Sequence, residues 1–313
     1  MKLGIIGVGA VGSATAMAVA MRACASELVL VDRTRSRAKG VATDMHYGVP
    51  LSSPTVTIRD GGYEDLDGAA LAIIAAGINE KAGGATDRGD PDGRLRLLEA
   101  NVKIFGDIVP RLAKVAPNAT ILVATDPPEP LVEVTRQLAG HDRVLSTSTY
   151  LDSLRFRIHL AQRLRVSPSC IEANVVGEHG TSSVFLWSSA RIGGMKLSEL
   201  LARHKIDGAE FRTAVEQDVR YANITIIEGT GASQYGIGMV AARVAEVVLR
   251  DERAVFPVGA HNPQFGTTVS LPSVVGRQGV VEVLMPEMSE EERQGLERSA
   301  GKLRDSVKRF LRP

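Results

Sequence analysis

The sequence has few cysteines, almost no net charge and no long apolar run, and each of these absences excludes a class of protein. Two cysteines are too few for a disulfide framework and favour a reducing compartment. A formal net charge of +1 leaves no strong basic field, so we expect no nucleic-acid partner. No stretch approaches the roughly 18 uncharged apolar residues that a membrane span needs. No CxxC pair or Cys/His cluster is present, so no metal site is predicted.

What the sequence does contain is enough apolar residues for a proper core. The chain has 313 residues, of which 44% are hydrophobic, and this length favours about two domains. The residues Met1 to Ile5 are typical of a strand and not of a signal peptide. We therefore expect a cytoplasmic protein with no membrane contact.

Three glycines, Gly7, Gly9 and Gly12, lie between an apolar stretch at residues 3–6 and a small-residue helical run at 14–21. A lone GxGxxG is a weak signal, but here it lies between a strand and a helix, as dinucleotide binding requires. The first glycine makes the turn, the second lets the backbone approach a pyrophosphate, and the third lets helix and strand pack closely. The helix N-terminus then offers free N–H groups to the phosphates.

A second apolar strand, residues 27–31, ends in Asp32. This acid follows the glycines by about 20 residues, where the dinucleotide fingerprint has a carboxylate that binds the ribose 2′-hydroxyl. A carboxylate would repel a 2′-phosphate, so the sequence favours NAD over NADP. Arg33, Arg35 and Arg37 weaken this preference slightly, because they could pair with such a phosphate.

Strands and helices alternate along the first half of the chain, which predicts an α/β protein with a Rossmann-type, doubly wound parallel sheet. The second half predicts an α+β catalytic domain, with the domains at residues 1–145 and 146–313. In the first half we expect strands at 3–6, 27–31, 55–58, 71–76, 119–124 and 143–145. In the second half we expect helices at 149–164, 208–229, 233–249 and 290–311, the last of them a solvated face, and strands at 171–176, 184–187, 254–258, 268–271 and 280–284.

The segment from Gly77 to Arg94 has no hydrophobic period and is dense in glycine and aspartate, so it is predicted to be a loop. It follows a strand whose carboxyl end should face the cofactor, which favours a lid. Arg94 would stand at the start of the next helix, where the dipole does not favour a cation, so a functional reason for this arginine is plausible.

One histidine stands out, because an apolar run ends at Gly177, and His179 is followed by another glycine. Histidine can take and give a proton near neutrality. The segment around Asp152 and Arg155 can supply a carboxylate to orient the imidazole and a guanidinium to bind an acid. The structural alternative for these two residues is an ordinary i,i+3 ion pair on a helix.

These residues, in this order and spacing along nearly the whole chain, resemble the L-lactate/malate dehydrogenase family. The resemblance rests on the glycine turn and on several later motifs. These are Asp32, Asn101 seven residues after Arg94, Asp152-x-x-Arg155, Gly177-Glu178-His179-Gly180, Ala232-Ser233-x-Tyr235-Gly236 and the region from Pro272 to Gly279. It implies an NAD-dependent oxidoreductase acting on a small 2-hydroxy or 2-keto acid, assembled as a homodimer or homotetramer.

The resemblance also implies roles for single residues. His179 matches the proton donor and acceptor, Asp152 its carboxylate partner, and Arg155 the arginine that binds the substrate carboxylate. Arg94 matches the lid arginine that polarises the reacting carbonyl, and Ser233 a residue that lines the substrate pocket, although helix capping is an alternative for Ser233. The implied cofactor site consists of Gly7, Gly9, Ala10, Val11, Gly12, Asp32, Ala76, Gly77, Asn101 and Thr125.

The sequence departs from the family in three places. The lid is longer, so the position facing the substrate tail falls on Glu80 when counted from the front and on Arg88 when counted from the back. Arg88 would favour a second carboxylate and Glu80 would repel one. Asp126 stands where the family has an asparagine that donates to the substrate oxygen, and an ionised aspartate is acceptor-only. Arg96 replaces the usual acid two residues after Arg94.

Three alternatives therefore stay open beside a lactate- or malate-like enzyme. Asp126 and the long lid allow a dehydrogenase for a bulkier or non-standard 2-hydroxy acid. Asp126 also allows a cofactor-binding protein with weak or lost catalysis. An NAD-dependent glycosidase would share the cofactor domain, but it needs metal ligands for which the sequence offers no Cys/His arrangement.

Overall fold

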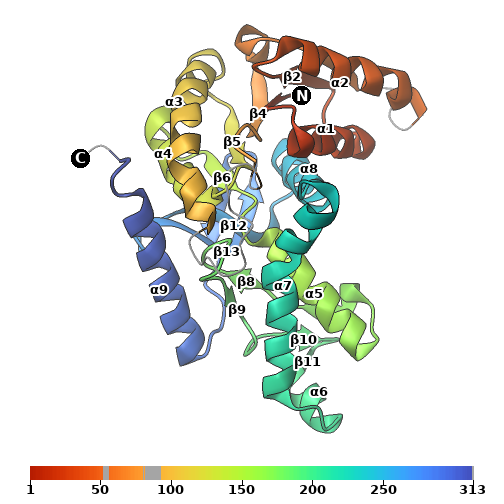
Figure 1. Cartoon of the computed structure of the whole chain (residues 1–313), viewed down its shortest axis with the longest axis vertical. Coiled ribbons are helices and arrows are strands. Elements are labelled where there is room, and N and C mark those ends of the chain that lie inside the picture. The colour runs from red at the N-terminus through yellow and green to blue at the C-terminus, as the bar shows by residue number, and fades with distance from the viewer. Residues whose placement is uncertain (52–55, 80, 82–92, 312–313) are drawn as a thin grey trace.

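The computed structural model describes residues 1–51, 56–79, 81 and 93–311, and a nine-stranded sheet forms the centre of this part of the chain (Figure 1). The strand order is β14-β13-β12-β6-β5-β4-β1-β2-β3. Six neighbouring strands are parallel, which confirms the predicted Rossmann-type sheet. They are β1 (Lys2–Ile6), β2 (Glu27–Val31), β3 (Thr57–Asp60), β4 (Ala69–Ile74), β5 (Thr120–Val123) and β6 (Val144–Ser146).

Helices cover both faces of the parallel strands, so these strands are apolar on both sides. On one face, α1 (Ala10–Arg22), α2 (Arg35–Gly48) and α8 (Tyr235–Arg250) pack against Leu3, Ile5 and their neighbours. On the other, α3 (Leu98–Val115) and α4 (Pro128–Ala139) enclose a second core around Phe105. Figure 1 shows the two helical layers on either side of the sheet. The carboxyl ends of β1, β4 and β5 meet at one edge, where the loops converge.

Three antiparallel strands extend this sheet beyond β6. They are β12 (Ala254–Asn262), β13 (Thr267–Gly276) and β14 (Gly279–Val283). The predicted strands are confirmed, but β12 and β13 are longer than expected, and β12 joins β6 where Gly259 pairs with Ser146. One continuous sheet therefore includes strands from both halves of the chain.

The remaining elements form a smaller layer around α5 (Tyr150–Leu164) and α7 (Gly208–Thr230). Its core contains Phe156, against which Phe185 and Trp187 pack edge-on, so Trp187 is a core residue, as predicted. The predicted strand at 171–176 is wrong in one respect, because Ala173 and Asn174 divide it into two. The short elements here are η4 (Pro168–Cys170), β7 (Ile171–Glu172), β8 (Val175–Val176), β9 (Val184–Phe185), β10 (Arg191–Ile192), β11 (Met195–Lys196) and α6 (Leu197–Arg203).

The C-terminal helix α9 (Glu290–Val307) is not the solvated face that its charge predicts. It begins with a capping box in which Ser289 and Glu292 exchange hydrogen bonds. Its apolar side, which includes Leu296 and Leu303, is buried against β13 and α4. The prediction is wrong because a narrow apolar stripe within a highly charged helix is enough to dock it.

Short 3-10 turns complete the fold. η1 (Val49–Leu51) and η2 (Tyr63–Leu66) flank the β3 region, and η3 (Gly93–Leu97) leads into α3. The backbone of Arg94 therefore lies in η3 and not in the first turn of the α-helix. The helix predicted to start at residue 233 begins at Tyr235, so Ser233 lies in the connection that precedes it.

Candidate active site

The glycine turn between β1 and α1 is built so that two of its glycines tolerate no side chain. Gly7 has a φ of +94°, and a Cβ there would lie 2.4 Å from the backbone nitrogen of Ala76. A Cβ at Gly12 would lie 1.9 Å from the carbonyl oxygen of Gly7. Gly9 differs, because a Cβ there would meet nothing within 4 Å. The protein itself thus requires glycine at 7 and 12, whereas the space beside Gly9 is open to a ligand.

Asp32 lies at the end of β2, and both of its oxygens accept backbone hydrogen bonds. Oδ2 accepts from the N–H of Val8 and Oδ1 from the N–H of Thr34, each at 2.8 Å. The carboxylate lines a cavity of about 880 Å³ that also borders Gly7, Gly9, Ala76 and Gly77. These contacts hold the acid in place beside the glycine turn, where it can accept hydroxyl hydrogen bonds.

A second cavity of about 300 Å³ shares Gly9 and Gly77 with the first, so the two are adjacent. It is lined by residues predicted to serve the cofactor and by residues predicted to serve the substrate. They include Ala10, Val11, Thr125, Asp126, Arg155, His179 and Ser233. Segments far apart in the sequence therefore meet in one place.

The loop that carries His179 is held from behind by two other elements. Gly177, with a φ of +87°, exchanges two backbone hydrogen bonds of 2.9 Å with Ser270 of β13. The N–H of Glu178 donates to the Oγ of Ser299 on α9 at 2.9 Å. A Cβ at Gly177 would lie 2.7 Å from that same Oγ. Glycine is thus required both by the backbone conformation and by the close approach of α9.

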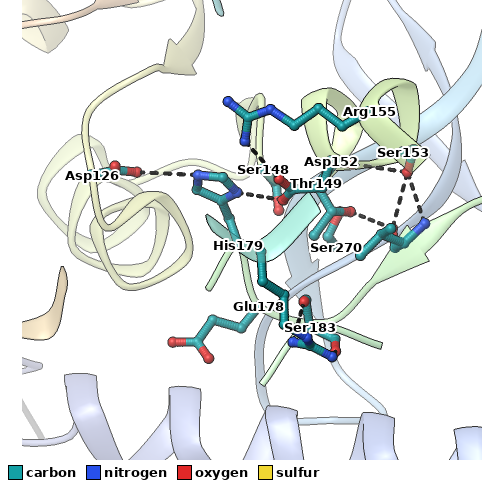
Figure 2. Close-up of polar contacts among 12 residues, drawn as sticks. Asp126, Ser148, Thr149, Asp152, Ser153, Arg155, Glu178, His179, Ser183 and Ser270 are labelled. Carbon is teal, nitrogen blue, oxygen red and sulfur yellow. Dashed lines mark hydrogen bonds and ion pairs between the residues drawn. The ribbon is translucent and has the colours of Figure 1, made fainter. Parts of the chain in front are cut away.

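The imidazole of His179 contacts the carboxylate of Asp152, with Nδ1 and Oδ2 2.5 Å apart (Figure 2). Asp152 stands in the first turn of α5 and is buried, and its other oxygen accepts from Nη1 of Arg155 at 3.2 Å. The i,i+3 ion pair is therefore present together with the contact to the histidine. With Nδ1 donating to the acid, Nε2 is the nitrogen that can exchange a proton in the cavity.

Asp126 follows β5 and lies on the other side of the imidazole, with Oδ1 3.8 Å from Nε2 of His179. Its backbone is fixed by Asn101, whose Nδ2 donates to the Asp126 carbonyl at 2.6 Å. Oδ1 of Asn101 accepts the N–H of Ile78 at 2.8 Å. Asn101 is fully buried, so it connects two loops at the cavity wall. The neighbouring Thr125 donates to the carbonyl of Ala76 at 3.0 Å.

Glu129 is a residue that the sequence analysis missed. It stands at the start of α4 with its side chain buried, and its Oε1 accepts both the backbone N–H of His179, at 3.1 Å, and the hydroxyl of Ser148. Oε2 has no hydrogen-bond partner among the described residues. Burial raises the pKa of this carboxyl to about 7, although the charge of His179 opposes the shift. An acid in a first helical turn has an ordinary explanation in the helix dipole, so the sequence carried no signal.

Several predicted residues lie outside what the structure describes. Glu80 and Arg88 fall outside the described residues, and for Arg94 only the backbone is described. The alternatives at the substrate-tail position therefore stay open. Within the described ranges, no group of three or more histidine, cysteine, aspartate or glutamate side chains could hold a metal ion. No helix in the same ranges is long and apolar enough to cross a membrane.

Two family models together match almost the whole chain. Residues 1–145 match the lactate/malate dehydrogenase NAD-binding domain, and residues 149–312 match the lactate/malate dehydrogenase alpha/beta C-terminal domain. The chain is 43% identical over 310 residues to the L-lactate dehydrogenase of Chloroherpeton thalassium, covering 98% of this chain and 99% of the relative. It is 43% identical to that of Thermus aquaticus, covering 96% of each. The solved structure of a minor L-lactate dehydrogenase from Enterococcus mundtii superposes with a TM-score of 0.92 at 31% identity, covering 100% of this chain and 99% of that one.

Proposed function

This chain belongs to the lactate/malate dehydrogenase family, and we propose on that basis that it interconverts pyruvate and L-lactate with NADH and NAD. It is an oxidoreductase that transfers a hydride between NAD and a small 2-hydroxy acid. The choice of lactate follows the names of the full-length relatives. The observation that carries the proposal is the arrangement of Asp152, Arg155 and His179 at a cavity that adjoins the glycine turn.

The residues present fit a dinucleotide. The close contacts behind Gly7 and Gly12 bring the backbone up to the larger cavity, and the open space beside Gly9 leaves room for a pyrophosphate. Asp32 would accept hydrogen bonds from the ribose, and its charge favours NAD over NADP. Gly7, Gly9, Ala10, Val11, Gly12, Asp32, Ala76, Gly77 and Thr125 would hold the cofactor, with Asn101 supporting the loops from behind. When bound, NADH supplies the hydride.

His179 would supply the proton. In reduction, Nε2 gives its proton to the keto oxygen as the carbonyl carbon receives the hydride, and the ring becomes neutral. In oxidation, the neutral ring takes the hydroxyl proton. Asp152 stabilises the charged ring through Nδ1 and fixes its tautomer, because the two atoms are 2.5 Å apart in a buried position.

Arg155 would bind the substrate carboxylate. Its side chain is mostly buried at the cavity wall, and one nitrogen already pairs with Asp152, which holds the guanidinium in place. A guanidinium can bind a carboxylate through two parallel hydrogen bonds and thereby orient the keto group toward His179. We assign Arg94 the polarisation of the carbonyl from the lid, Glu80 or Arg88 the contact to the substrate tail, and Ser233 a place in the pocket wall.

A substrate panel tests the proposal. We expect NADH to be consumed with pyruvate and more slowly, if at all, with oxaloacetate and with branched 2-keto acids. Preference for oxaloacetate would instead assign Arg88 to the tail position and make the enzyme malate-like. Preference for a branched keto acid would favour the bulkier-substrate alternative. NADH binding without turnover on any 2-keto acid would contradict the proposal.

Asp126 favours a second candidate, a family member with weak catalysis on standard substrates. A carboxylate close to the reacting nitrogen cannot donate to a keto oxygen, as the family asparagine does. If this is the limitation, Asp126→Asn will raise the turnover of pyruvate. A fall in turnover with both pyruvate and oxaloacetate would exclude it.

We also propose the coarser organisation of the protein. Two domains would meet near Ser146, which agrees with the separate matches to residues 1–145 and 149–312. We expect a homodimer or homotetramer in the cytoplasm, by analogy with the family. Light scattering of the purified chain tests the assembly.

A further inference from the structure

The imidazole of His179 lies between two carboxylates and not beside one. Asp152 contacts Nδ1 from α5, and Asp126 reaches toward Nε2 from the turn after β5, with its Oδ1 3.8 Å away. Figure 2 shows the two acids on opposite edges of the ring. The side chain of His179 is 14% exposed and that of Asp126 is 23% exposed, so water screens this pair only in part.

We propose that Asp126 stabilises the protonated form of His179 directly at its reacting nitrogen, and so biases the enzyme toward 2-keto acid reduction. A carboxylate within about 4–6 Å favours the charged form of an ionisable neighbour. Reduction needs the imidazolium and oxidation needs the neutral ring. The inference about direction rests on the proposed function, whereas the inference about protonation does not.

The other charges around the ring leave this role to Asp126. Asp152 and Arg155 carry opposite charges and largely offset each other at the Nδ1 edge. Glu129 of α4 binds the backbone N–H of His179 and not its ring. Behind the loop, Glu178 lies 3.9 Å from Lys302 of α9 and accepts the N–H of Ser182, and Arg220 of α7 donates to the Thr181 carbonyl. Arg37 borders the same cavity from α2.

The proton transfer shows what this second acid does to the reaction. As the keto acid is reduced, the hydride forms the C–H bond, the C=O π bond breaks, and the Nε2 proton moves to the oxygen, which leaves a neutral imidazole. Asp126 stabilises the imidazolium before the step more than the neutral ring after it. The enzyme therefore stays ready for reduction at higher pH, while each proton transfer becomes less favourable.

The same acid lowers the rate of the reverse reaction near neutral pH. Oxidation of the hydroxy acid begins with a neutral Nε2 that accepts the hydroxyl proton. Since Asp126 delays the loss of the Nε2 proton, this form of the enzyme accumulates only at more alkaline pH. Replacing Asp126 should thus narrow the pH range of reduction and extend the range of oxidation downward.

An NMR titration of the purified protein, with its histidines isotopically labelled, tests the protonation directly. The sequence has six histidines, and the signal of His179 is assigned by its loss in His179→Gln. We expect the midpoint of its titration to fall by about one pH unit in Asp126→Asn. Asp126→Ser should give a similar fall, since it removes the charge without adding an amide donor. The matched control is Asp142→Asn, an exposed acid that pairs with Arg136 far from the histidine, and its midpoint should equal that of the parent.

Two further arrangements separate the possible outcomes. Because Glu129 ionises near the same pH, the Asp126→Asn comparison is repeated in a Glu129→Gln background, and the fall should persist there. The pH profiles of pyruvate reduction and lactate oxidation should move down by the same amount as the NMR midpoint. An unchanged midpoint in both folded Asp126 variants overturns the proposal, whatever the substrate is. A shifted midpoint without turnover of any 2-keto acid supports the protonation but contradicts the proposed function.

Discussion

Glu129 accepts the backbone N–H of His179 at 3.1 Å, from the side opposite the cavity that the imidazole faces. The two residues are 50 positions apart in the sequence, and a buried acid from α4 thereby fixes the main chain of the proton-transferring residue. Burial raises the pKa of the Glu129 carboxyl to about 7, from the ordinary value of 4.5. A group with this property makes the stability of the loop depend on pH.

The first prediction concerns stability and pH. The folded protein favours protonated Glu129, so its contribution to stability is fully present below about pH 4.5 and is lost as the pH rises to about 7. Glu129→Gln keeps an acceptor for the His179 N–H and cannot ionise. Its free energy of unfolding, relative to the parent, should therefore rise by about 3 kcal/mol between pH 5 and pH 8. Urea unfolding at the two pH values measures the difference, and a constant difference would contradict the ionisation of Glu129.

A second prediction separates the glycines of the cofactor turn. A Cβ at Gly9 meets nothing within 4 Å, whereas a Cβ at Gly12 would lie 1.9 Å from the Gly7 carbonyl oxygen. Gly9→Ala should keep the melting temperature of the parent and lose NADH affinity, because only the cofactor needs that space. Gly12→Ala should unfold at a lower temperature without any ligand. The account fails here if Gly9→Ala binds NADH as tightly as the parent.

The third prediction concerns the support of the histidine loop by α9. Gly177→Ala introduces a Cβ 2.7 Å from the Oγ of Ser299 at a φ of +87°. It should destabilise the protein by about 1–3 kcal/mol and lower the turnover number more than it raises KM. Gly194→Ala is the matched control, because its φ is +82° but a Cβ there meets nothing within 4 Å. The control should lose stability through backbone strain alone and keep its turnover number, and equal losses in both variants would refute a specific role for the α9 contact.

The fourth prediction concerns Asp152. Asp152→Asn removes the charge that stabilises the protonated His179 ring through the 2.5 Å contact. Turnover of pyruvate should fall by at least about a hundredfold. Dissociation of NADH, followed by its fluorescence, should be unchanged, since the acid lies near the substrate and not in the glycine turn. A variant that keeps the parental turnover number would show that the contact is structural.

The elements that could be predicted from the sequence are those whose signal is local. The turn from Gly7 to Gly12 and the acid at the end of β2 follow from a strand, three glycines and a helix within 32 residues, and the structure brings them to one cavity. The residues Asp152, Arg155 and His179 were identified through family motifs, and the structure brings them together. Their neighbourhood is a long-range property, but each motif is itself short.

The elements that were missed depend on contacts between distant segments. Nothing near Glu129 indicates that His179 will lie above it, and nothing in the charged α9 sequence indicates that Ser299 will accept the N–H of Glu178. The docking of β12 beside β6 likewise rests on one pairing between Gly259 and Ser146. Short apolar patterns predict that these segments are ordered, but not which partner each one meets.

The most direct test of the central claim measures pyruvate reduction and NADH binding side by side in the parent and in His179→Ala. The account predicts that turnover falls by about a hundredfold to ten-thousandfold in the variant. It also predicts that NADH affinity stays within about twofold, since the imidazole serves the proton and not the dinucleotide. A variant that reduces pyruvate as fast as the parent while binding NADH normally would contradict the assignment of His179 as the proton donor.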